Sequence, residues 1–177
     1  QALLWAEYVQ DTPEACNLRG LIYLQLGRKE NSRKEFEKSK SLNPNYLEAL
    51  INLGGLDFDL GNFDSAELNY KRALEISKTE KEAILGLARC AIAKKEIDKC
   101  AQILKDAPPS PDTDIVWGEL MLFQEKYNEA KTYYEKAIRK NRDFLLAYIR
   151  LAEVCRILNQ KEEAREAYRR ALKINPE

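Results

Sequence analysis

The chain has 177 residues, of which 45% are hydrophobic and 33% are charged, enough for one domain with a buried core. Its 29 Lys and Arg residues balance its 29 Asp and Glu residues, so the formal net charge is zero. We therefore expect no nucleic-acid partner, because neutralising phosphates requires an excess of basic residues. No apolar run approaches membrane-spanning length, so we expect no membrane insertion either.

Residues 1–12 form an N-terminal segment whose apolar side chains include Leu4, Trp5 and Tyr8. We interpret it as the second helix left from an earlier helical repeat, and the alternative is a capping helix that belongs to this domain. The chain begins at Gln1 rather than Met. Whether a segment precedes Gln1, and whether the full-length protein is exported, are therefore questions that stay open.

Residues 13–46 form the first of five predicted repeats, each made of two amphipathic helices. Thr12 can cap the first helix, and Pro13 fits its first position. Apolar side chains recur every three or four residues, which is the helical period. The basic second helix carries Glu35 and Glu37 among its lysines and arginines, so we interpret its charge as a solvent-exposed face.

Residues 47–80 form the clearest repeat, with two helices joined at Gly61 and Asn62. Gly61 suits a left-handed turn after the first helix, and Asn62 suits the N-cap of the second. Asp57 and Asp59 alternate along the first helix and no further ligand is close in sequence, which disfavours metal or acid–base chemistry. We expect both carboxylates to be solvated or to face a partner.

Residues 81–110 form a shorter and irregular third repeat. Lys95 occupies the position that Gly61 has in the second repeat. Pro108 and Pro109 end the second helix early, because proline removes a backbone donor and clashes with a continuing helix. We expect a kink or a change of superhelical pitch there. A tolerated deletion is the simpler explanation, and a functional hinge is the alternative.

Residues 111–144 and 145–177 form the fourth and fifth repeats, and the five repeats form one continuous predicted domain. Trp117 is expected on the buried side of the fourth repeat. No polar capping helix follows the fifth repeat, so Tyr168 and Leu172 should belong to an exposed apolar face.

Four kinds of position recur in register through the five repeats. A small residue falls on each first helix, and each second helix carries two small residues with a ring or large apolar residue between them. Where two helices cross closely only a small side chain fits, and a bulky one fills the space beside it. The four sets are Gly20, Gly54, Ala88, Gly118 and Ala152; Ser32, Ala66, Cys100, Ala130 and Ala164; Phe36, Tyr70, Leu104, Tyr134 and Tyr168; and Ser39, Ala73, Ala107, Ala137 and Ala171.

This pattern, with its period of 34 residues, resembles the tetratricopeptide repeat family over nearly the whole chain. The resemblance implies an all-α fold, a solenoid of antiparallel helix pairs wound into a right-handed superhelix. It says much less about a particular role, because the fold hosts many binding functions.

Side chains suited to catalysis or metal binding are scarce. The chain has no histidine, the commonest general base and zinc ligand. Its cysteines, Cys16, Cys90, Cys100 and Cys155, lack CxxC spacing, and we interpret them as buried free thiols because three lie at small-residue positions. Cys90 and Cys100 lie on the two helices of one hairpin, which leaves an approach between them open. We expect no catalysis, no metal and no cofactor.

The family resemblance places the first helices on a concave groove that contacts a partner. The residues implied at its contact positions are Asn17, Leu21, Leu24, Ile51, Asn52, Phe58, Asp59, Leu85, Arg89, Ile92, Ile115, Glu119, Leu122, Phe123, Ile149, Arg150, Glu153 and Arg156. Members that bind chaperone tails use a clamp of Lys, Asn and Arg, to which Asn52 corresponds. Leu21, Glu82 and Gly86 occupy other clamp positions, so we expect no carboxylate clamp.

An apolar groove with Asp57 and Asp59 in the second repeat and Arg150 and Arg156 toward the end suits an amphipathic helix or an extended peptide. The alternative for several of the apolar residues is packing between adjacent repeats. Our leading hypothesis is a cytoplasmic protein-interaction scaffold that binds such a segment of a partner protein. The alternatives are a substrate-recruiting accessory region of a larger enzyme and a module that self-associates through its ends.

Overall fold

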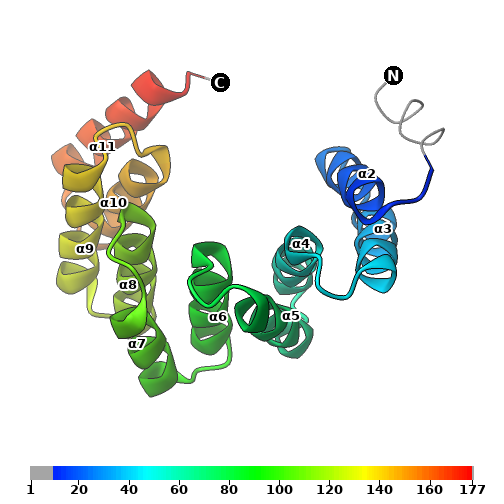
Figure 1. Cartoon of the computed structure of the whole chain (residues 1–177). Helices are drawn as coiled ribbons and strands as arrows, with labels where there is room; N and C mark the ends of the chain where they lie inside the picture. Colours follow the sequence, from blue (N-terminus) through cyan, green and yellow to red (C-terminus); the bar gives the residue numbers. More distant parts are fainter. Residues whose placement is uncertain (1–9, 177) are drawn as a thin grey trace. The chain divides into compact units, whose positions relative to one another are not determined.

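The computed structural model describes residues 10–176, and the regular secondary structure of this part of the chain is entirely helical (Figure 1). The all-α solenoid class predicted from the sequence is confirmed. The helices group into two compact units, Gln1–Lys94 and Lys95–Glu177. The single continuous domain stays a prediction. The leftover or capping helix predicted in residues 1–12 falls largely outside the described residues.

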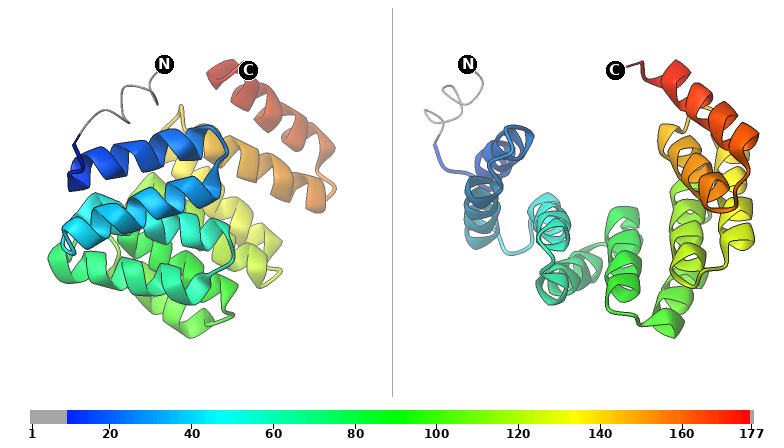
Figure 2. Two further views of the ribbon diagram at one scale, coloured as in Figure 1. Left: turned by 90° about the vertical axis from the view of Figure 1, so that its right-hand side faces the viewer. Right: turned by 180° about the vertical axis from the view of Figure 1, so that it is seen from behind.

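The described part of the first unit contains two helical hairpins followed by one further helix. Its helices are α2 (Pro13–Gln25), α3 (Lys29–Leu42), α4 (Leu47–Asp59), α5 (Phe63–Ile76) and α6 (Lys81–Ala93). α2 packs against α3, α4 packs against α5, and α6 lies against α5 (Figure 2). The predicted start of α2 is confirmed, because Thr12 Oγ1 accepts a hydrogen bond from the Ala15 N–H at 3.2 Å.

The second unit contains one helix followed by two helical hairpins. Its helices are α7 (Ile97–Asp106), α8 (Pro111–Phe123), α9 (Tyr127–Lys140), α10 (Leu145–Ile157) and α11 (Lys161–Ile174). The early end predicted before Pro108 is confirmed, since α7 has 10 residues and the other second helices have 14. Ser110 then caps α8, because its Oγ accepts a hydrogen bond from the Thr113 N–H at 3.1 Å.

The turns between the two helices of each repeat contain a left-handed residue at one fixed position. Its φ angle is 71° at Gly27, 79° at Gly61, 63° at Lys95, 59° at Glu125 and 60° at Asn159. The left-handed turn predicted at Gly61 is confirmed. Lys95 adopts the same conformation, although a side chain there costs about 1–2 kcal/mol relative to glycine. The missing glycine of the third repeat therefore leaves the form of this turn unchanged.

Glycines at the helix crossings allow aromatic rings to pack directly on the helix backbone. A Cβ at Gly54 would lie 2.6 Å from Tyr70 Cε1, and a Cβ at Gly86 would lie 2.3 Å from Tyr70 Cζ. Tyr70 is therefore held between α4 of its own repeat and α6 of the next one. In the second unit, a Cβ at Gly118 would lie 2.2 Å from Tyr134 Cε1. The predicted pairing of a small residue with a bulky one is confirmed for Gly54 with Tyr70 and for Gly118 with Tyr134, whereas the contact of Gly86 with Tyr70 was not predicted.

Asp57 is buried, so the expectation that it is solvated or faces a partner is wrong. Its Oδ1 accepts a hydrogen bond from Arg33 Nε at 3.0 Å. Its Oδ2 accepts hydrogen bonds from Ser65 Oγ at 2.5 Å and from Asn69 Nδ2 at 3.2 Å. These partners come from α3 and α5, and a buried carboxylate needs such partners to remain stable. Asp57 thus joins three helices of the first unit, whereas Asp59 is exposed as expected.

All four cysteines are free and buried, as predicted from their small-residue positions. Burial raises the pKa of the Cys100 thiol to about 12, and it also raises the pKa values of Cys16 and Cys155. A protonated and inaccessible thiol is a poor nucleophile. Cys90 belongs to the first unit and Cys100 to the second, and an approach between them stays a prediction.

Two expectations concern large side chains of the second unit. Trp117 is half-buried, and its ring stacks on that of Tyr133 in α9, with centroids 5.7 Å apart and planes inclined by 11°. Tyr168 and Leu172 of α11 are both exposed, in agreement with the predicted apolar face. The second unit therefore shows large apolar side chains both packed within a hairpin and open to solvent.

Candidate partner-binding surfaces

In the first unit, the residues implied at the contact surface come from α2, α4 and α6. Leu21 and Asp59 are exposed, Leu24, Ile51, Asn52, Phe58, Arg89 and Ile92 are half-buried, and Asn17 and Leu85 are buried. The structure brings two of them together, because Asn52 Nδ2 donates a hydrogen bond to Asn17 Oδ1 at 2.8 Å. Asn17 and Leu85 are buried and therefore offer little side-chain surface to a partner.

Phe58 packs within its own hairpin, so its ring is not left free for the contact surface that the family resemblance implies. The ring centroid lies 5.3 Å from that of Phe63, the first residue of α5, and the two planes are inclined by 57°. Such aromatic pairs stabilise a fold beyond the area that they bury. Replacing Phe58 would therefore weaken folding as well as any contact, so this side chain cannot report on binding alone.

In the second unit, the implied residues come from α8 and α10. Phe123 and Arg156 are exposed, Glu119, Leu122, Ile149, Arg150 and Glu153 are half-buried, and Ile115 is buried and offers no surface. Ile157 was missed by the sequence analysis although it ends α10 as Phe123 ends α8. The exposed fractions of the two side chains are 43% for Phe123 and 49% for Ile157. The 34-residue period that separates them is the signal that could have found it.

Three of the implied residues form a charged cluster between α8 and α10. Arg150 Nη1 lies 2.9 Å from Glu153 Oε2, and Arg150 Nη2 lies 3.9 Å from Glu119 Oε1. Burial opposes the charge of Arg150, but the hydrogen bond to Glu153 and the two nearby carboxylates outweigh it and raise the pKa of the guanidinium. Arg156 has no ion-pair partner within residues 10–176. Arg156 is therefore the cation that this surface offers to a partner.

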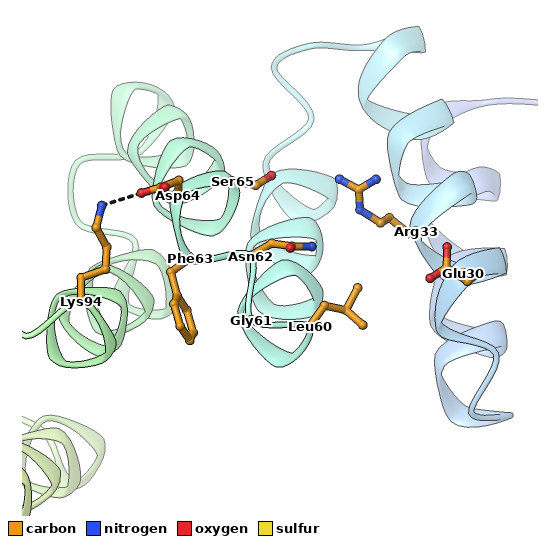
Figure 3. A pocket seen from close by; sticks show the side chains of 9 residues that line it. All are labelled: Glu30, Arg33, Leu60, Gly61, Asn62, Phe63, Asp64, Ser65 and Lys94. Atoms are coloured by element: carbon orange, nitrogen blue, oxygen red, sulfur yellow. Dashed lines mark hydrogen bonds and ion pairs between the residues drawn. The ribbon is translucent and has the colours of Figure 1, made fainter.

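Figure 3 shows an open pocket of the first unit that the sequence analysis did not identify. Its volume is 680 Å³, and the residues lining it are Glu30, Arg33, Leu60, Gly61, Asn62, Phe63, Asp64, Ser65 and Lys94. Lys94 Nζ lies 2.7 Å from Asp64 Oδ1 and 2.8 Å from Glu67 Oε2, and these carboxylates raise the pKa of the ammonium group. Arg33 already binds Asp57. The cations of this pocket are thus neutralised inside the unit.

No helix in the described part of the chain is long and apolar enough to cross a membrane. Residues 10–176 also contain no group of three or more His, Cys, Asp or Glu side chains placed to hold a metal ion.

Antiparallel helix pairs that present side chains of their first helices are characteristic of α-solenoid scaffolds, which bind other proteins. Three sequence profiles with the description "Tetratricopeptide repeat" match this chain, at residues 13–46, 57–121 and 116–177. The chain belongs to the tetratricopeptide repeat family, as its packing positions indicated.

The curated relatives are longer proteins. The BBSome complex member BBS4 homolog of Drosophila melanogaster is 27% identical over 93% of this chain and 37% of its own length. The peroxisomal targeting signal receptor of Kluyveromyces lactis is 26% identical over 99% of this chain and 32% of its own length. The Hsp70-Hsp90 organizing protein 2 of Arabidopsis thaliana is 30% identical over 44% of this chain and 14% of its own length. The chain thus spans well under half of each relative.

Solved structures share the fold. A thermophilic tetratricopeptide repeat protein of Thermus thermophilus matches with a TM-score of 0.84 and 21% identity, over 93% of this chain and 92% of that one. A tetratricopeptide repeat protein of Parabacteroides merdae matches with a TM-score of 0.87 and 20% identity, over 98% of this chain and 71% of that one. At these identities the likeness concerns the fold alone.

Proposed function

We propose that the chain is a protein-interaction scaffold whose α8 and α10 bind an apolar peptide segment or amphipathic helix of a partner protein. The observation that carries this proposal is the pair of exposed apolar side chains, Phe123 and Ile157, at equivalent positions of two first helices. Exposed apolar side chains that form a patch are typical of contact surfaces, and we infer that Phe123 and Ile157 contribute to one such surface. A ring that contributes little to folding while exposed can dominate binding once a partner covers it.

The charges near these side chains favour one composition of the partner. Arg156 directly precedes Ile157 and is exposed, whereas Arg150 is neutralised by Glu119 and Glu153. An acidic residue beside the apolar anchors of the partner would meet Arg156. Such complementary charges orient a partner more than they add affinity.

The names of the relatives support a binding role. One is described as a member of a complex, one as a receptor for a targeting signal and one as an organizing protein. Each description involves contact with another molecule, and none is tied to a residue of this chain. We carry over only the common element, which is recognition of other proteins by the repeats.

The test is a double variant in which Phe123 and Ile157 are both replaced by alanine. Its control is Leu68→Ala, because Leu68 is 65% exposed on α5, a second helix of the first unit. A peptide selected on the unmodified chain from a displayed random library serves as the probe, and its affinity is measured by fluorescence anisotropy. We expect the double variant to bind about thirtyfold more weakly, as loss of a hot spot of about 2 kcal/mol predicts.

Folding is followed in parallel by thermal denaturation. Both variants should stay within about 0.5 kcal/mol of the unmodified chain, as exposed sites usually do. Equal affinity in all three proteins would show that binding occurs elsewhere, and unfolding of the double variant would show that the two side chains belong to the core.

Light scattering over a dilution series tests self-association through Tyr168 and Leu172. The full-length reading frame tests the accessory-region alternative.

A further inference from the structure

A second pocket lies in the fifth repeat and shares no residue with the surface around Phe123. Its volume is 350 Å³, and the residues lining it are Arg142, Asp143, Tyr148, Arg170, Lys173 and Ile174. The turn before α10 supplies the first two residues, and the last turns of α11 supply the final three. Three cations and one carboxylate therefore face a small space that also has an aromatic and an aliphatic wall.

Fewer cations of this pocket are paired with carboxylates than in the pocket of the first unit. Arg170 Nε lies 3.1 Å from Glu166 Oε1, so one of the three has an acidic partner. Arg142 and Lys173 have no ion-pair partner among residues 10–176. Asp143 is the single carboxylate in the lining, and it leaves an excess of positive charge.

The second repeat provides an internal comparison, because the same place in its fold is neutral. Arg72 has the position on α5 that Arg170 has on α11, and it pairs with Glu75. Arg72 Nη2 also donates a hydrogen bond to Asn45 Oδ1 at 2.7 Å. In the fifth repeat, Lys173 occupies the position that Glu75 has in the second repeat. The excess charge is therefore a property of the fifth repeat and not of the repeat fold.

We propose that this pocket binds carboxylate side chains of an acidic peptide segment, as a contact additional to the surface around Phe123 and Ile157. Guanidinium groups such as that of Arg142 fit carboxylates through two parallel hydrogen bonds. Tyr148 and Ile174 provide apolar surface for the aliphatic stem of a glutamate, which a free inorganic anion would not use. Asp143 opposes the ligand and limits its affinity.

The experiment measures binding of fluorescein-labelled hexaglutamate, with hexaglutamine as the neutral probe and inorganic phosphate as the competitor. Lys173→Glu restores the charge that Glu75 has in the second repeat. Lys161→Glu is the matched control, because it makes the same change of net charge at an exposed site of the same helix outside the pocket. Asp143→Asn removes the opposing carboxylate. Circular dichroism verifies that each variant is folded.

We expect Lys173→Glu to weaken hexaglutamate binding by at least roughly tenfold, Lys161→Glu to weaken it by less than about twofold, and Asp143→Asn to strengthen it. The double variant of Phe123 and Ile157 should bind hexaglutamate normally, which separates this proposal from the proposed function. Absence of hexaglutamate binding, or equal losses in the two lysine variants, would overturn the proposal. So would binding of phosphate as tight as that of hexaglutamate, because the pocket would then take a free anion.

Discussion

Single glycines fix how closely the helices of this chain approach one another. Gly54 and Gly86 both lie against the Tyr70 ring, so closely that a Cβ at either position would clash with it. Gly55 differs, although it is adjacent in the same helix, because a Cβ there would lie 3.7 Å from the Tyr70 hydroxyl, an ordinary contact. Two neighbouring glycines thus have opposite expected responses to the same substitution.

Gly55→Ala should stabilise the chain by up to about 1 kcal/mol, because alanine favours a helix interior over glycine. Gly54→Ala has the same propensity gain but forces the ring of Tyr70 to move, and overpacking of about 1–3 kcal/mol outweighs it. Urea denaturation followed by circular dichroism measures both. Equal shifts in one direction would contradict the packing of Tyr70 on Gly54.

At the scale of helices, sequence signals predicted the elements well because the signals are local. The start of α2 follows from Thr12 and Pro13, and the early end of α7 follows from Pro108. The packing role of Gly86 was missed, because sequence alone gives a glycine no partner. The role of Gly86 follows only from the position of Tyr70 on the preceding helix, α5.

The candidate site was predicted less well, because exposure depends on neighbouring helices. Phe58 and Asp57 both lie on a first helix, yet both are packed against other helices. Phe58 contacts a ring of α5, and Asp57 accepts hydrogen bonds from side chains of α3 and α5. Ile157 could have been found from the 34-residue period. The basic pocket could not, since Arg142 and Lys173 belong to segments that only the folded hairpin brings together.

A prediction at the same scale concerns the link between α3, α4 and α5. Asp57→Ala removes the acceptor of Arg33 and Asn69, so we expect a loss of about 2–3 kcal/mol, discounted from a fully buried pair because Arg33 is 35% exposed. Asp59→Ala removes an exposed carboxylate two residues away and should change stability by less than about 0.5 kcal/mol. Comparable urea midpoints for the two variants would show that the Asp57 contacts do not stabilise the unit.

At the scale of the whole chain, the chain divides into two units between Lys94 and Lys95. This division decides whether a substitution that destabilises one unit also destabilises the other. In repeat proteins each repeat contacts its neighbours, and stability is close to a sum of local terms. A change within one unit then need not alter the other. The chain contains two tryptophans, and Trp117 lies in the second unit, so its fluorescence reports on that unit once Trp5 is replaced by phenylalanine.

We expect the two units to unfold with separate midpoints. In the Trp5→Phe background, Asp57→Ala should lower the urea midpoint of part of the circular dichroism signal and leave the Trp117 fluorescence midpoint unchanged. Gly118→Ala should lower the Trp117 fluorescence midpoint and leave unchanged the part of the circular dichroism signal that comes from the first unit. The reason is that its Cβ would lie 2.2 Å from Tyr134 Cε1 in the second unit. The two variants together exclude a trivial insensitivity of either probe. If each variant shifts both signals equally, the chain unfolds cooperatively as the single continuous domain that its sequence pattern predicts.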